Sequence, residues 1–125
     1  MDKFEKLFAQ YPWTMSDDMV KEAAADILAK HFDENNNVEV WKQCLHSIDL
    51  TTLNGEDTTE KVEKMAQAVN EFEDHFPEIP NVAAMCVYPA LVQTAADTLT
   101  EPIGIAAVAA GFPASQTFVE IKVAE

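Results

Sequence analysis

The stretch that decides the fold is Val82-Ala83-Ala84-Met85-Cys86-Val87-Tyr88, an unbroken run of apolar and aromatic residues that Pro89 closes. A strand that is apolar on both faces is typical of a parallel sheet covered by helices, whereas a half-exposed strand alternates apolar with polar residues. We therefore predict a buried parallel strand at 82–88, with a helix on either side of it along the chain.

Similar patterns repeat on both sides of this strand. Residues 48–52 and 103–110 read as further strands, and the segments between the strands carry apolar residues at helical spacing. Asp57-x-x-Glu60 and Thr117-x-x-Glu120 have the spacing of helix capping boxes. Three βα units about thirty residues apart predict an α/β fold, either a doubly wound sheet or part of a (βα)8 barrel. No glycine-rich phosphate loop follows the first strand, which favours the barrel.

The segment before the first strand has a different character. Ser16-Asp17-Asp18 is a typical helix start, and a 3.6-residue apolar period follows it, while Asn37 can begin a second helix. We predict a helical extension at 1–46 and three βα units at 47–125. The last predicted helix stops at Glu125 after about two turns without a C-cap signal, so we expect an interrupted domain.

Charge and composition exclude several classes of function. The 125 residues carry a net charge of −14, and all eight basic residues are lysines. Such a chain lacks the basic surface that binds nucleic acid or an anionic membrane. No apolar run is long enough for a membrane span and the N-terminus lacks a signal-peptide pattern, so we expect a cytoplasmic protein.

The metal-binding residue types show no ligand pattern. Cys44 and Cys86 have no CxxC spacing and lie in apolar segments, which predicts two buried free thiols. His31, His46 and His75 are scattered along the chain. We expect neither a metal site nor a cofactor.

Asp49 is the least expected residue of the first strand. It lies inside the apolar part of Ser47-Ile48-Asp49-Leu50-Thr51, where burial of an unpaired carboxylate would be costly. Two explanations are consistent with the residues alone. The strand lies at an exposed edge, or the carboxylate faces a ligand.

Three segments taken together resemble a known family. They are "DLTTLN" at 49–54, "AAMCVYPALV" at 83–92 and "IAAVAAGFPAS" at 105–115, in this order and spacing. Over residues 41–125 the chain resembles the N-terminal portion of 2-deoxyribose-5-phosphate aldolases. The resemblance implies a TIM barrel that cleaves its phosphosugar to acetaldehyde and glyceraldehyde 3-phosphate through a lysine Schiff base. It also implies that Asp49, Thr51, Asn54 and Cys86 contact the substrate.

The resemblance ends before the family's Schiff-base lysine and phosphate loops. All eight lysines of this chain lie in predicted helices or at helix ends, and a Schiff-base lysine needs burial or a neighbouring cation. We therefore expect the chain alone to be inactive, with no catalytic residue of its own. We expect it to form a homo-oligomer or to pair with a complementing C-terminal segment. The alternative is a non-catalytic, acidic α/β interaction module.

Overall fold

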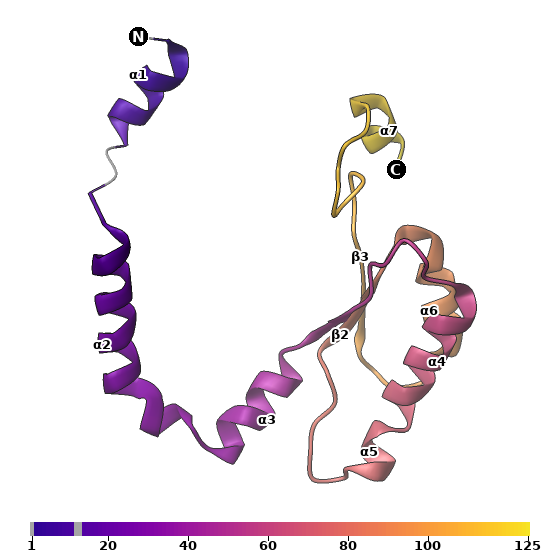
Figure 1. Cartoon of the computed structure of the whole chain (residues 1–125). Coiled ribbons are helices and arrows are strands. Elements are labelled where there is room, and N and C mark those ends of the chain that lie inside the picture. Colours follow the sequence, from indigo (N-terminus) through magenta and orange to yellow (C-terminus); the bar gives the residue numbers. More distant parts are fainter. Residues whose placement is uncertain (1, 12–13) are drawn as a thin grey trace. The chain divides into compact units, whose positions relative to one another are not determined.

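A computed structural model of the chain describes residues 2–11 and 14–125. The contacts divide the chain into two units, residues 1–37 and 38–125. The first unit holds α1 (Lys3–Gln10) and α2 (Asp17–Asn35) (Figure 1). The expected start of α2 is confirmed, because the Ser16 hydroxyl accepts a hydrogen bond from the Met19 N–H at 3.3 Å. Neither helix has a buried residue.

The second unit is built on a three-stranded parallel sheet, which confirms the predicted α/β class. The strand order is β1-β2-β3, so each strand lies beside the next one along the chain. All three strands are shorter than the sequence predicts. The elements are α3 (Val38–His46), β1 (Asp49–Thr51), α4 (Thr59–Asn70), α5 (Phe72–His75), β2 (Ala84–Val87), a 3-10 turn (Pro89–Leu91), α6 (Val92–Thr98), β3 (Gly104–Ala107) and α7 (Val119–Ala124).

The hydrophobic core lies on one face of the sheet. Val62 and Ala66 of α4 pack with Met85 and Val87 of β2 and Ala95 of α6, and all five side chains are buried. Figure 1 shows α4 and α6 on the same side of the strands. A doubly wound sheet carries helices on both faces, whereas the helices of a βα barrel surround its outside. The open sheet is therefore compatible with a segment of an α/β barrel.

Two predicted helix starts are wrong. Thr58 caps α4 in place of Asp57, and its hydroxyl accepts from the Lys61 N–H at 3.2 Å. The Asp57 carboxylate binds the preceding loop and the Lys61 side chain, so it does not cap the helix. The last helix, α7, begins after Phe118 without any side-chain cap.

The prediction for Cys44 is also wrong. Cys44 is exposed, whereas Cys86 is buried as expected. Cys44 belongs to α3, none of whose residues is buried. An apolar stripe on a helix therefore does not establish that another element covers it. In the part of the chain that the structure describes, no helix combines the length and the apolar character needed to cross a bilayer.

Candidate functional site

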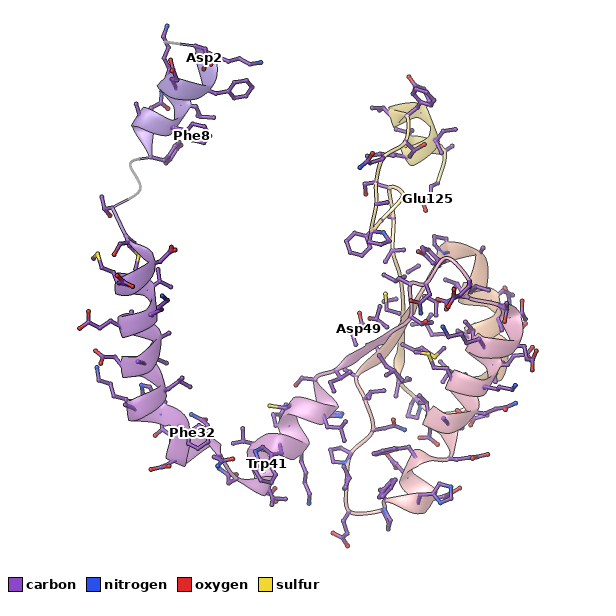
Figure 2. All side chains as sticks on the ribbon, viewed as in Figure 1. Asp2, Phe8, Phe32, Trp41, Asp49 and Glu125 are labelled. Atoms are coloured by element: carbon purple, nitrogen blue, oxygen red, sulfur yellow. The ribbon has the colours of Figure 1, made fainter. Side chains whose placement is uncertain are left out.

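The face of the sheet opposite the core carries the candidate site residues. Met85 and Val87 point into the core, so Cys86, which lies between them on β2, points to the other face. The register pairs Thr51 with Cys86, and Asp49 with Ala84. Directly paired residues of a parallel sheet share a face, so Asp49, Thr51 and Cys86 lie on one face. Figure 2 shows the Asp49 side chain on the side of the strands away from α4 and α6.

The side chains on this face of β2 and β3 are small. β3 contributes Gly104 beside Ala84 and Ala106 beside Cys86. A Cβ atom on Gly104 would lie 3.3 Å from the Ala84 Cβ, which is a tight contact. The face is therefore lined by small residues between the strands, with the carboxylate of Asp49 exposed at one side.

The loop after β1 is held in place by a buried carboxylate. The side chain of Asp57 is only 1% exposed. It accepts hydrogen bonds from the Thr52 hydroxyl at 2.9 and 3.0 Å, from the Asn54 N–H at 3.0 Å and from the Lys61 ammonium. The Lys61 contact, together with those of Thr52 and Asn54, outweighs burial and holds the pKa of Asp57 below its usual value.

The same network orients Asn54. Its side-chain amide donates to the Thr52 hydroxyl oxygen at 3.3 Å, so Asn54 is bound through both its backbone and its side chain. The neighbouring residue is tied to the end of β2, because the Tyr88 hydroxyl donates to the Leu53 carbonyl at 2.9 Å. The loops that follow β1 and β2 are thereby joined at the carboxyl edge of the sheet. This is the edge where sites of parallel α/β proteins lie.

Of the four predicted site residues, three lie on the open face and the fourth lies in the adjoining loop. Asp49 is exposed, and the Thr51 hydroxyl donates to the Asp49 carbonyl at 2.9 Å. Cys86 is 7% exposed, and Asn54 is exposed in the loop. The sequence pattern did not predict the contacts of Asp57 and Tyr88. The spacing of Asp57 and Lys61, four residues apart, was a usable signal for their ion pair.

None of the lysines lies on a strand of the sheet. All eight belong to helices: Lys3, Lys6, Lys21, Lys30, Lys42, Lys61, Lys64 and Lys122. Lys21, Lys42, Lys61 and Lys64 each have a carboxylate oxygen within 4 Å, and the partners of the last two are Asp57 and Glu60. Among residues 2–11 and 14–125, no group of three or more His, Cys, Asp and Glu could hold a metal ion.

Comparison with known proteins identifies relatives for part of the chain. Human deoxyribose-phosphate aldolase is 37% identical over 89 residues, which cover 62% of this chain and 28% of the human protein. A Caenorhabditis elegans protein of the same family name is 32% identical over 117 residues, covering 86% of this chain and 37% of its own length. The bovine aldolase is 36% identical over 89 residues, or 62% of this chain and 28% of its own length.

These matches confirm that this chain resembles part of a deoxyribose-phosphate aldolase. The chain spans between 28% and 37% of the length of the curated relatives quoted above. No protein-family model matches the chain, and no solved structure does.

Proposed function

We propose that this chain supplies the first three βα units of a deoxyribose-phosphate aldolase barrel. In this proposal it forms the part of the pocket wall that faces the sugar. The phosphosugar substrate, the aldol cleavage and the lysine Schiff base belong to the complete barrel. The chain by itself has no catalytic residue.

One observation carries the proposal. α4 and α6 pack on one face of the sheet, and Asp49, Thr51 and Cys86 lie on the opposite face, with Asp49 at the start of β1 and Thr51 at its carboxyl end. In a βα barrel that bare face is the interior, and the carboxyl edge is the mouth where substrates bind.

Each of the four residues has a side chain that can contact a sugar, three of them by hydrogen bonds and one by packing. The Asp49 carboxylate accepts a hydrogen bond from a sugar hydroxyl or from a water molecule beside it. The Thr51 hydroxyl and the Asn54 amide donate to and accept from neighbouring hydroxyls. Cys86 is a small, buried side chain that limits the depth of the pocket.

Cleavage needs a group that these residues do not provide. A class I aldolase first condenses a lysine amine with the substrate aldehyde, which takes up a proton and releases water, to form an iminium ion. A base then removes the proton of the hydroxyl on the β carbon, and the bond between the α and β carbons breaks as its electrons move toward the iminium nitrogen. The lysines of this chain lie on helices, and the open face carries none at its paired strand positions.

A chimera tests the proposal. The 89 matched residues of human deoxyribose-phosphate aldolase are replaced by the corresponding residues of this chain, and the cleavage of 2-deoxyribose 5-phosphate is measured. We expect an active chimera. Asp49→Asn in the chimera lowers kcat/KM by about 10- to 100-fold, the effect of losing one hydrogen bond to a charged group.

Asp97→Asn is the matched control for this change. Asp97 is exposed on α6 and accepts a hydrogen bond from the Gln93 side chain at 2.8 Å, remote from the open face. The control variant should retain the activity of the parent chimera. An inactive but folded chimera, or an Asp49→Asn chimera with full activity, would contradict the proposal.

A further inference from the structure

The hydrogen-bond network behind the loop after β1 has a direction, which follows from its donors and acceptors. The Lys61 ammonium holds the pKa of Asp57 below its usual value, so at neutral pH this carboxylate is ionised and only accepts hydrogen bonds. Lys61 donates to its Oδ1 atom, and the Asn54 N–H donates to its Oδ2 atom. The Thr52 hydroxyl oxygen lies 3.0 and 2.9 Å from these two oxygens, so its proton points to the carboxylate.

This direction fixes the side-chain amide of Asn54. Because Thr52 gives its proton to Asp57, the Thr52 oxygen can only accept a further hydrogen bond. The Asn54 Nδ2 atom lies 3.3 Å from that oxygen and donates to it. If the amide were turned over, two oxygens without a proton between them would face each other at this distance. The Nδ2 end is therefore held against Thr52, and the Oδ1 end is directed away from it.

The network is anchored in the sheet beside the candidate site. The Thr52 N–H donates to the Cys86 carbonyl at 3.0 Å, which continues the pairing of β1 with β2. Thr51 lies on the open face, and side chains alternate along a strand, so Thr52 lies on the face toward α4. Asn54 itself is exposed at the carboxyl edge of the sheet. The network therefore holds Asn54 from the side of the core.

We propose that Asp57 is a positioning residue that makes Asn54 a hydrogen-bond acceptor for a hydroxyl group of the ligand. A sugar hydroxyl can donate to the Asn54 Oδ1 atom, whereas a phosphate dianion has no proton to give. Together with the Asp49 carboxylate, Asn54 thus favours the hydroxyl-bearing part of a phosphosugar over its phosphate. This inference rests on the proposed function and adds which group of the substrate faces the loop after β1.

Two substitutions break the network at different points. Asp57→Asn places the amino end of an amide against either the Lys61 ammonium or the Asn54 N–H, because both carboxylate oxygens accept from donors. Thr52→Val removes the oxygen that accepts from Asn54. Each variant frees the Asn54 amide to turn. Thr52→Ser keeps the hydroxyl and should rescue the orientation.

Glu60→Gln is the matched control for Asp57→Asn. The Glu60 carboxylate accepts a hydrogen bond from the Lys64 ammonium at 2.7 Å, so it too pairs with a lysine four residues further along α4. Its side chain is 75% exposed, whereas that of Asp57 is 1% exposed. The control therefore removes a carboxylate of the same helix without altering the buried network.

Nuclear Overhauser effects in the isotope-labelled full chain test the orientation without any activity. The Asn54 side-chain amide protons should show contacts with the side chain of residue 52 in the unaltered chain, in Thr52→Ser and in Glu60→Gln. Asp57→Asn and Thr52→Val should lose these contacts, and circular dichroism verifies that each variant is folded. Contacts that are absent from the unaltered chain, or that survive in both broken variants, would overturn the proposal.

Kinetics of the active chimera test the ligand. Asp57→Asn should raise KM by about 3- to 10-fold with little change in kcat, because the misplaced acceptor serves a hydroxyl that keeps its proton during cleavage. Asn54→Ala should raise KM to a similar extent. If Asp57 acts through Asn54, adding Asp57→Asn to Asn54→Ala should change KM by less than about 2-fold. Glu60→Gln should leave both constants unchanged.

The outcomes separate this inference from the proposed function. Additive effects of Asp57→Asn and Asn54→Ala on KM, or a fall in kcat at constant KM, would overturn the inference and leave the chimera active. An inactive parent chimera would contradict the proposed function and the ligand named here. The amide contacts in the full chain would still decide whether Asp57 orients Asn54.

Discussion

Removal of the Thr52 hydroxyl should destabilise the loop that follows β1. Thr52 is 7% exposed, and its hydroxyl donates to the buried Asp57 carboxylate at 2.9 and 3.0 Å. Thr52→Val keeps the size of the side chain but removes this donor. A hydrogen bond to a charged group contributes about 1.5–3 kcal/mol. We expect the free energy of unfolding to fall by about that amount at neutral pH, as measured by urea denaturation.

The pH dependence gives this prediction a second readout. The pKa of Asp57 is lowered in the folded chain, chiefly by the Lys61 side chain and also by Thr52 and Asn54. The stability that comes from a lowered carboxyl pKa is fully present above the unfolded value of about 3.9 and is lost as the pH falls through the folded value. The difference between Thr52→Val and the unaltered chain should therefore shrink well below that pH.

Thr98→Val is the matched control for this experiment. The Thr98 hydroxyl donates to the Thr94 carbonyl at 2.8 Å within α6, so its acceptor is uncharged. Hydroxyl contacts of this kind contribute little to helix stability, and the control should lie within about 0.5 kcal/mol of the unaltered chain at both pH values. A Thr52→Val variant as stable as this control, or a destabilisation that persists undiminished in acid, would refute the reasoning.

Three further changes test other contacts of the second unit by the same denaturation assay. Asn81→Ala removes a buried side chain whose amide donates to the Val69 carbonyl at 2.8 Å. It should lower the free energy of unfolding by about 2–4 kcal/mol, because buried backbone groups lose their partners. A smaller loss would contradict this role of Asn81. Ser115 has φ of 54°, so Ser115→Gly should stabilise the chain by up to about 1 kcal/mol, and a destabilised variant would be evidence against strain there. Tyr88→Phe removes the hydrogen bond to the Leu53 carbonyl and should cost about 1 kcal/mol, with faster amide exchange in the loop after β1; unchanged exchange would argue against the link.

The three strands and the helices α4 and α6 that pack on them could be predicted because each follows from a local pattern. The apolar run around Met85 and the 3.6-residue period around Val62 mark elements that pack against each other in the core. The predicted capping box at Asp57 failed because the same residue is four positions from Lys61 and close to Thr52. In its buried position the Asp57 carboxylate accepts hydrogen bonds from a hydroxyl, a backbone N–H and an ammonium group. These contacts are more favourable than those of a carboxylate that caps an exposed helix end.

The site could be predicted only in part. The two-residue alternation of a strand predicts that Asp49 and Thr51 share a face, but it does not give the register that places Thr51 beside Cys86. Register depends on pairing between strands more than thirty residues apart along the chain, and no short motif encodes it. For Cys44, an amphipathic pattern predicts a helix but does not reveal whether another element covers that helix.

The central claim is that this chain lines part of the substrate pocket but lacks the Schiff-base lysine that the cleavage requires. Borohydride reduction in the presence of 2-deoxyribose 5-phosphate, followed by intact mass spectrometry, tests this claim most directly, because borohydride converts any Schiff base into a stable amine. We predict an unmodified mass of 13.9 kDa for the chain alone. A covalent adduct on one of the eight lysines would contradict the claim and would identify a nucleophile within this chain.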